Sequence, residues 1–455
     1  MSDLFVGGDY IVVMRYLFLS LLLACGSSKE SATTPPGPDS GDSATEDTTA
    51  PTETGAVTIA PVVQFDGARP THLLVISVDT LRWDRVSEPG VMPFLRRVLD
   101  RGVVAAQHQS CANWTHPSMT CAWSGRNIWE YGLLPVGASD ARLDEDVVTL
   151  PTMLADHGYS SVLVAANGFV AEEKFGLGDA FDVVHLDREG GIDSFAEIIL
   201  ETAEGFAGPD PLYLHVHFME PHSPYDFQEG FTVGPADLPE QMIIEDYVTG
   251  WRGMTAERQA VLVEQLSALY DGEVRYLDTR LAQLWHVLDQ RGLLDDTLVV
   301  FLTDHGEQFS EHGALAHGRS VHREETDAMF ALWSKGIQPV SFQRHTGHRD
   351  VVPTVLDALG LPPVEVDGHV LGMAPADVLT FSAFAKGQDT ELALDYGNER
   401  LIYIFNGNAS YYVDDPLELN DLGPGHPELV RDLFDLMRPE VAKLEEVLGI
   451  TAVEP

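Results

Sequence analysis

The period of apolar and polar positions changes repeatedly along the chain, and these changes predict alternating strands and helices from residue 62 onward. Continuous apolar runs, typical of strands buried on both faces of a parallel sheet, occupy residues 71–79, 160–167, 211–218, 298–306 and 328–333. Apolar residues at helical spacing occupy residues 91–102 and 255–291, and each stretch ends at or next to a glycine. This alternation predicts an α/β fold with a doubly wound, mostly parallel sheet.

The pattern changes after residue 381. Short strand-like pieces such as L-I-Y-I-F and A-S-Y-Y-V lie between turn residues over 382–424, and an amphipathic helix is predicted over 426–447. We therefore predict a large domain over 62–381 and a C-terminal subdomain over 382–455. The subdomain is expected to contain a small antiparallel sheet and a helix.

The first 61 residues differ from the rest. Residues 16–24 form an apolar run, too short to span a bilayer as a helix, that is followed by Cys25. The stretch 1–25 resembles a bacterial lipoprotein signal. It implies an exported chain held by lipid on Cys25 to the cell envelope, facing the periplasm or the outer surface. An uncleaved or non-lipidated signal is the alternative. Residues 26–61 contain no aromatic residue and predict a disordered tether.

Acidic residues dominate the charge. Seventy-one Asp and Glu residues stand against 27 Lys and Arg residues, which gives a formal net charge of -44. Such a surface repels nucleic acid and attracts divalent cations, so no nucleic-acid partner is expected. The same charge also serves solubility alone, and it names no substrate.

Two cysteines lie on either side of Thr115, near which a short apolar helix is predicted to begin. Cys111 and Cys121 are ten residues apart, and an exported protein can pair such residues. Helix geometry would carry Cys121 away from Cys111, so we expect two buried thiols rather than a disulfide.

Candidate metal-binding residues follow two of the predicted buried strands. Asp79 ends the first strand, and Asp304 and His305 end a later one. Ligands of open α/β sheets bind beyond the carboxyl ends of the strands, where these side chains would meet. An Asp in such a place often only caps a helix or turn. The pairing of V-D-T-L-R with T-D-H-G-E, however, favours a divalent-metal site.

From about residue 70 to about residue 445 the chain resembles the sulfatase family of the alkaline phosphatase superfamily. Ordered motifs carry the resemblance, among them V-D-T-L-R-W-D, T-H-P-S-M-T-C-A-W-S-G-R, F-M-E-P-H-S-P-Y, Y-D-G-E-V-R-Y-L-D and L-V-V-F-L-T-D-H-G-E-Q-F-S-E-H-G. The resemblance implies that the large domain is catalytic. It also implies a substrate that is a small-molecule, lipid or glycan ester.

One departure from the family changes the expected chemistry. Family sulfatases oxidise a Cys or Ser to formylglycine, but this chain has Thr115 at that position, and Met119 where an Arg follows Pro-Ser. Oxidation of a secondary alcohol would give a ketone rather than the aldehyde. Relatives in the superfamily use an unmodified Thr or Ser to attack phosphorus, which implies that Thr115 is both nucleophile and metal ligand. The alternative is that Thr115 only caps the helix of a relic site.

The resemblance implies a metal held by Asp79, Thr115, Asp304 and His305. Calcium sulfatases usually present two adjacent Asp residues and then Asp-Asn. The imidazole of His305 therefore favours zinc or manganese over calcium or magnesium. Glu220 and His222 are weaker candidates for a second zinc.

Three further residues receive roles through the resemblance. His222 is expected beside the anionic group of the substrate, as a catalytic and substrate-binding residue. His317 is expected near the leaving oxygen, where it can donate a proton. Arg126 ends the nucleophile helix and could bind an anion. Structural roles are expected for His312, His345 and His348.

Together these features predict a metal-dependent hydrolase or transferase acting on phosphate mono- or diesters. A sulfatase with an unusual nucleophile is one alternative. A catalytically inactive protein that binds anions or glycans is the other.

Overall fold

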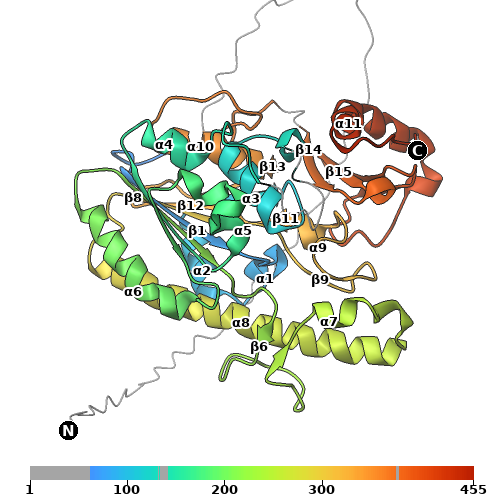
Figure 1. Cartoon of the computed structure of the whole chain (residues 1–455), viewed down its shortest axis with the longest axis horizontal. Helices are drawn as coiled ribbons and strands as arrows, with labels where there is room; N and C mark the ends of the chain where they lie inside the picture. Colours follow the sequence, from blue (N-terminus) through green and yellow to red (C-terminus); the bar gives the residue numbers. More distant parts are fainter. Residues whose placement is uncertain (1–61, 132, 134–141, 376–378) are drawn as a thin grey trace, which may run out of the picture. The chain divides into compact units, whose positions relative to one another are not determined.

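The computed structural model describes residues 62–131, 133, 142–375 and 379–455, and these belong to one compact unit (Figure 1). The predicted lipoprotein signal over 1–25 and the tether over 26–61 lie outside the described residues. Among the described helices, none has the length and apolar character needed to cross a bilayer.

A nine-stranded sheet forms the centre of this described unit. Its strand order is β11-β2-β12-β8-β1-β5-β3-β4, with β13 paired to β2. The strands are β1 (His72–Val78), β2 (Val103–Gln109), β3 (Ser160–Ala165), β4 (Val183–Leu186), β5 (Leu212–Phe218), β8 (Thr297–Thr303), β11 (Asp327–Ala328), β12 (Phe330–Trp333) and β13 (Val340–Gly347). Strands β8, β1, β5, β3 and β4 are all parallel, whereas β12 is antiparallel to both β8 and β2. The predicted mostly parallel α/β sheet is confirmed.

Helices cover both faces of the sheet, so successive residues of a central strand enter different cores. On β1, Leu74 and Ile76 join a core with the helices of one face, whereas Leu73 and Val75 join the core of the other. The first face carries α2 (Pro93–Leu99), α6 (Ile192–Ala203) and α8 (Ala256–Gln290), and the second carries α3 (Thr115–Ser124), α4 (Leu150–Ala155) and α10 (Val351–Ala358) (Figure 1). Burial on both faces explains the continuous apolar runs in the sequence.

The C-terminal segment forms the predicted small antiparallel sheet and helix. The sheet contains β14 (Thr380–Phe384), β15 (Glu391–Tyr396), β16 (Glu399–Ile404) and β17 (Ala409–Val413), and α11 (Pro427–Leu448) packs against it. Because β14 begins at Thr380, the predicted boundary after residue 381 falls inside a strand. The division into a large domain and a subdomain stays a prediction.

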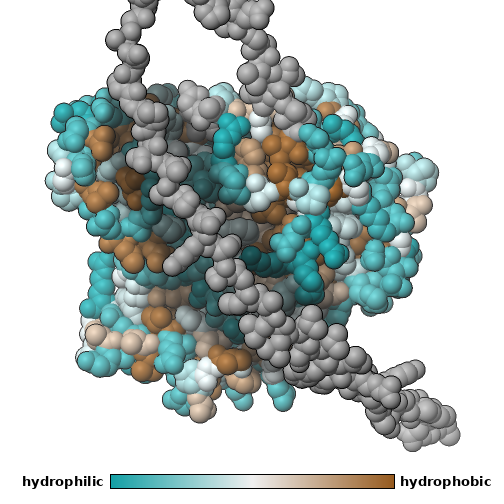
Figure 2. Space-filling view, turned by 180° about the vertical axis from the view of Figure 1, so that it is seen from behind, coloured by the Kyte–Doolittle hydropathy of each residue, from teal (hydrophilic) through white to brown (hydrophobic). Residues whose placement is uncertain are grey.

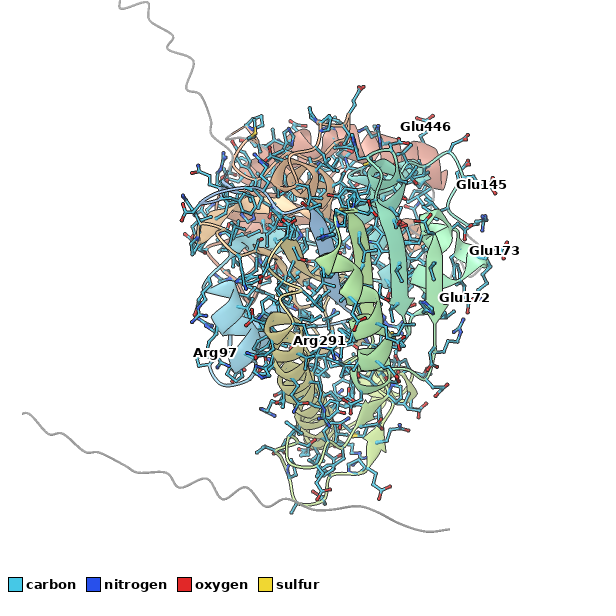
Figure 3. All side chains as sticks on the ribbon, turned by 90° about the vertical axis from the view of Figure 1, so that its left-hand side faces the viewer. Arg97, Glu145, Glu172, Glu173, Arg291 and Glu446 are labelled. Carbon is cyan, nitrogen blue, oxygen red and sulfur yellow. A yellow bond between two sulfur atoms is a disulfide. The ribbon has the colours of Figure 1, made fainter. Side chains whose placement is uncertain are left out.

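The outer surface carries much of the acidic charge. Figure 3 shows charged side chains on the outside of the unit, including Glu145, Glu173 and Glu446, all of which are exposed. The face in Figure 2 mixes hydrophilic residues with small hydrophobic groups.

Cys111 and Cys121 form a disulfide, with their Cα atoms 6.4 Å apart. The expectation of two separate thiols is therefore wrong. Cys111 lies between β2 and α3, and the chain turns over residues 112–114 before the helix begins. After this turn the second turn of α3 passes close to Cys111, so the helix brings the two residues together instead of separating them.

Candidate active site

Two buried carboxylates lie side by side at the carboxyl edge of the central sheet. Asp79 follows β1 and Asp304 follows the neighbouring strand β8, and both side chains are fully buried. Asp304 Oδ1 accepts hydrogen bonds from the backbone N–H groups of Thr80 (3.1 Å) and His305 (2.8 Å). Asp304 Oδ2 and Asp79 Oδ1 have no hydrogen-bond donor among the described residues. Burial and the negative charge of Asp79 raise the pKa of Asp304. A bound cation would relieve the repulsion between the two carboxylates.

Thr115 faces these carboxylates from the first turn of α3. Its hydroxyl oxygen lies 3.3 Å from Asp79 Oδ2 and 3.5 Å from His305 Nε2. The helix cap is Trp114. The interpretation of Thr115 as a simple cap is therefore wrong, because its hydroxyl contacts Asp79 and His305. Asn167 Nδ2 donates to Asp79 Oδ2 at 2.6 Å and lies 3.3 Å from the Thr115 oxygen.

His305 completes a set of four converging atoms. Its Nε2 lies 3.3 Å from Asp304 Oδ2 and 3.8 Å from Asp79 Oδ1. Its Nδ1 lies 2.9 Å from the carbonyl oxygen of Gly306, to which it can donate, so Nε2 can carry the free lone pair. Burial lowers the pKa of His305 well below its ordinary value, which favours the neutral form that binds metals.

The spacing of these atoms matches a metal site. Ligands placed tetrahedrally about 2.1 Å from a zinc ion lie about 3.4 Å from one another. The separations of 3.3, 3.5 and 3.8 Å around His305 Nε2 are close to that value. Two carboxylate oxygens without donors, a hydroxyl and an imidazole nitrogen therefore fit a divalent ion.

His217, on β5, is a site residue that the sequence analysis missed. Its Nε2 lies 3.3 Å from Asp79 Oδ2, and Asp79, His217 and Asp304 each offer a ligand atom within 4.8 Å of the others. A signal was available, because Tyr213, His215 and His217 alternate with apolar residues in the strand. Side chains two residues apart share a face of a sheet, and this face also carries Asp79.

His317 and His222 lie beside the carboxylate group. The ring centroid of His317 lies 4.5 Å from that of His305 and 5.3 Å from that of His222. His317 Nδ1 lies 3.1 Å from Oε1 of the buried Glu307. Burial opposes a charge on His317, but the Glu307 carboxylate outweighs this effect and raises the pKa of His317 to about 9. His222 Nδ1 donates to the backbone oxygen of Ser223 at 2.6 Å.

The structure does not bring Arg126 or Glu220 to this group. Arg126 lies beyond the far end of α3, about 15 Å along the helix from Thr115 at 1.5 Å per residue, and it donates to the backbone oxygen of Glu365 at 2.8 Å. Glu220 accepts a hydrogen bond from the N–H of Ile192 (2.9 Å) at the start of α6. This arrangement offers no support for anion binding by Arg126 or for a second zinc on Glu220.

The sulfatase family model matches residues 71–361, which is more than half of the chain and includes every residue of this group. The chain belongs to the sulfatase family. Among its curated relatives is the multifunctional alkaline phosphatase superfamily protein PehA of Trinickia caryophylli, 26% identical over 235 residues, which are 44% of this chain and 43% of PehA. The choline-sulfatase of Rhizobium meliloti (strain 1021) is 27% identical over 233 residues, covering 47% and 44% of the two chains.

A solved structure has the same fold. The crystal structure of the phosphonate monoester hydrolase of Agrobacterium radiobacter superposes with a TM-score of 0.66 at 18% identity, over 83% of this chain and 96% of that one. The matches to PehA and to the choline-sulfatase, by contrast, span less than half of the lengths of those proteins.

Proposed function

We propose that this sulfatase-family protein is a metal-dependent ester hydrolase or transferase in which Thr115 attacks the phosphorus of a phosphate mono- or diester. The observation that carries the proposal is the placement of the Thr115 hydroxyl. It lies 3.5 Å from His305 Nε2, at the spacing of metal ligands, and 3.3 Å from Asp79 Oδ2, the neighbour of the Oδ1 that has no donor among the described residues.

The surroundings of Thr115 support an unmodified hydroxyl and a phosphate ester rather than a sulfate ester. A threonine cannot give the aldehyde of formylglycine. Met119, at the position of the usual Arg, is fully buried among apolar side chains. Cys111 and Cys121 bond to each other, so neither offers a free thiol beside Thr115.

Asp79, Thr115, Asp304 and His305 would hold the ion, and the imidazole favours zinc or manganese. When bound, the ion lowers the pKa of the hydroxyl and offsets negative charge on the phosphoryl oxygens. Asn167, which contacts both Asp79 and the hydroxyl, holds the nucleophile in position.

The histidines supply proton transfer and substrate contact. The oxygen of Thr115, without its proton, bonds to phosphorus while the bond from phosphorus to the leaving oxygen breaks. His317, held charged by Glu307, gives its Nε2 proton to that oxygen. Water or an acceptor alcohol then attacks phosphorus, returns a proton to His317 and frees Thr115. His222 hydrogen-bonds a phosphoryl oxygen.

A sulfatase with an unusual nucleophile is the second candidate, and the match to a choline-sulfatase favours it. Matched aryl phosphate, aryl phosphate diester and aryl sulfate substrates distinguish the two candidates in the presence of zinc or manganese. Faster turnover of a phosphate ester is expected. Faster turnover of the sulfate would contradict the phosphate preference, and no turnover of any of the three would favour an anion-binding protein.

A further inference from the structure

A chain of hydrogen bonds behind His317 extends beyond Glu307 to Tyr225. The Tyr225 hydroxyl donates to Glu307 Oε2 at 2.8 Å, and Glu307 Oε1 accepts from His317 Nδ1 at 3.1 Å. Tyr225 and Glu307 are fully buried, so solvent does not compete for these bonds. Burial and the Glu307 carboxylate raise the pKa of Tyr225 well above its ordinary value. The hydroxyl therefore keeps the proton that it donates, and each oxygen of the carboxylate has one donor.

The position of His317 in the backbone is fixed by its neighbours. It follows the short strand β10 (Leu315–Ala316), and the residues before and after it have φ values of 66° and 67°. The N–H of Gly318 donates to the backbone oxygen of Asn113 at 3.0 Å. The ring itself has one hydrogen bond among the described residues, from Nδ1 to Glu307. The rotation of the ring, and thus the direction of Nε2, therefore depends on Glu307.

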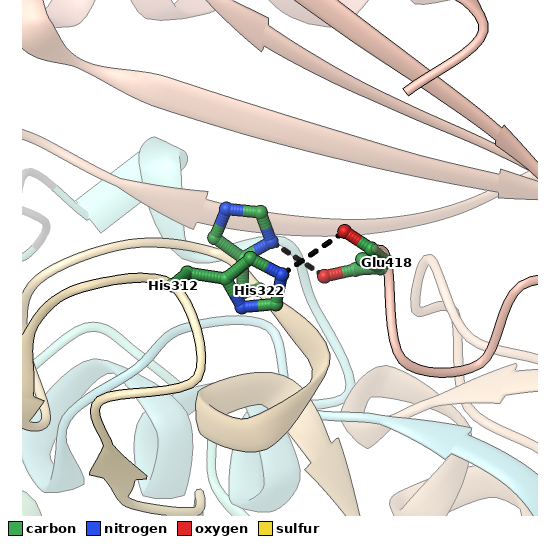
Figure 4. A group of neighbouring side chains, drawn as sticks. All are labelled: His312, His322 and Glu418. Carbon is green, nitrogen blue, oxygen red and sulfur yellow. Dashed lines mark hydrogen bonds and ion pairs between the residues drawn. The ribbon is translucent and has the colours of Figure 1, made fainter. Parts of the chain in front are cut away.

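His312, five residues before His317, shows the contrasting case of a histidine with partners on both nitrogens. Its Nδ1 lies 2.6 Å from Glu324 Oε1, and its Nε2 lies 3.1 Å from the backbone oxygen of Glu418. Its ring also stacks on that of His322, with the centroids 3.6 Å apart (Figure 4). No nitrogen of His312 is left for a substrate. His317 Nε2, by contrast, has no partner in the described part of the chain and can contact one.

Packing rather than the hydroxyl holds the Tyr225 side chain in place. Strand β6 (Tyr225–Asp226) pairs with β7 (Gln241–Met242). The Tyr225 ring lies against the rings of Tyr270 and Phe309, with centroid distances of 5.7 and 6.0 Å. A phenylalanine would fill the same space, so Tyr225→Phe removes the bond to Glu307 and little else.

We propose that Tyr225 is a positioning residue for proton donation by His317, a role that rests on the function proposed above. Its hydroxyl holds the Glu307 carboxylate in the orientation that bonds Nδ1, and this bond directs Nε2 of His317 toward the leaving oxygen. Without the hydroxyl, Glu307 Oε2 has no donor among the described residues, and the carboxylate can rotate away from the ring. Esters with poor leaving groups then lose the most, because they need a proton in the transition state.

Substrates with graded leaving groups test this role. Wild type, Tyr225→Phe and Tyr159→Phe, all folded and metal-loaded, are compared on a series of phosphate esters. Tyr159→Phe is the matched control, because its hydroxyl donates to the backbone oxygen of Thr71 at 2.7 Å, at the opposite edge of the sheet. Tyr225→Phe should lower kcat/KM by about tenfold or more for poor leaving groups and much less for nitrophenyl esters. Tyr159→Phe should keep the wild-type slope of log kcat/KM against leaving-group pKa. An equal change for all leaving groups in Tyr225→Phe would overturn the proposal, because a structural role alone slows them alike.

A double variant tests whether Tyr225 acts through His317. In the His317→Gln background, Tyr225→Phe should cause no further loss for poor leaving groups, because the proton donor is already absent. A further loss as large as the loss in the wild-type background would overturn the proposal.

Nitrogen NMR of the histidine rings gives a readout that needs no turnover. In zinc-loaded protein with isotope-labelled histidine, the Nδ1 signal of His317 is assigned by its absence from His317→Gln. This signal should shift in Tyr225→Phe and stay unchanged in Tyr159→Phe. An unchanged signal in Tyr225→Phe would overturn the proposal and leave the nucleophilic role of Thr115 untouched. Absence of turnover with every ester would contradict the proposed function, whereas the shift would still show that Tyr225 holds the ring.

Discussion

His217 Nδ1 lies 2.8 Å from Ser77 Oγ, across the parallel pairing of β1 and β5 that places these two residues opposite each other. Ser77 Oγ also lies 2.8 Å from His215 Nε2, and His215 Nδ1 lies 2.8 Å from the hydroxyl of Tyr213. This buried chain of polar groups holds the His217 ring with Nε2 facing Asp79. If His217 Nε2 carries the lone pair, His217 Nδ1 donates to Ser77 Oγ, the Ser77 hydroxyl donates to His215 Nε2, and His215 Nδ1 donates to the Tyr213 oxygen.

His217→Ala should weaken metal binding by about 10- to 100-fold, as expected when a ligand or its outer contact is removed. Ser77→Ala should have a smaller effect in the same direction, because it only releases the ring. The metal dissociation constant, measured by competition with a chelator, checks both. The control is His185→Ala, because His185 is exposed on β4. Unchanged metal affinity in a folded His217→Ala protein would refute this role.

Metal removal should abolish turnover and lower the melting temperature, because two buried carboxylates would then face each other without a cation. Zinc or manganese should restore both properties. Asp304→Ala should lower metal content and turnover together, measured on the same samples. A chelator-treated protein that keeps full turnover after its metal has been shown to be absent would contradict the metal-dependent mechanism.

His317→Gln should slow substrates with poor leaving groups by about a hundredfold or more, because these need a proton in the transition state. Substrates with good leaving groups, such as nitrophenyl esters, should slow much less. The slope of log kcat/KM against leaving-group pKa therefore becomes steeper in the variant. An equal loss for all leaving groups would assign His317 to binding instead of proton donation.

Cys25→Ser tests the lipid anchor that the sequence predicts. If lipid on Cys25 holds the chain to the envelope, the variant should leave the membrane fraction while its turnover stays unchanged. Immunoblots of membrane and soluble fractions measure this. Equal membrane attachment of variant and wild type would exclude the anchor at Cys25.

The sequence predicts the centre of the sheet well and its edges poorly. Strands β1 and β8 are buried on both faces, so their apolar runs are continuous, and the polar residues that follow them mark the site. Strands β4 and β13 were missed because β4 is exposed throughout and β13 is mostly exposed and polar. Strand β2, which pairs with β12 and β13 inside the sheet, was missed as well, because its second half is polar. Edge strands such as β4 and β13 are stabilised by pairing with the neighbouring strand, so the pattern of apolar residues in their own sequence does not reveal them.

The sequence predicts only part of the candidate site, and the position of each residue within its helix or strand explains which part. Asp79, Asp304 and Thr115 stand at the ends of elements, where sequence patterns change. His217 lies inside a strand, where a histidine resembles a core residue. Its alternation with His215 places both on one face, but the pairing of His217 with Ser77 is needed to show that this face also carries Asp79. The disulfide depended on a three-residue turn whose path the sequence does not fix.

Two substitutions of Thr115 bracket its role. Thr115→Ser keeps a hydroxyl and should retain measurable turnover. Thr115→Ala should lose about a hundredfold or more in kcat, because water must replace a positioned nucleophile. Stability should change little in both, since Trp114 rather than Thr115 caps the helix. A metal-loaded Thr115→Ala protein with near-normal turnover would be incompatible with a nucleophilic Thr115.

The most direct measurement traps the covalent step. Metal-loaded protein is mixed with a slow aryl phosphate ester, quenched in acid, digested and examined by mass spectrometry. The account predicts phosphate on the peptide that contains Thr115, located on that residue and absent from Thr115→Ala. A full burst of product alcohol in wild type with no phosphate on Thr115 at any time of quenching would contradict it.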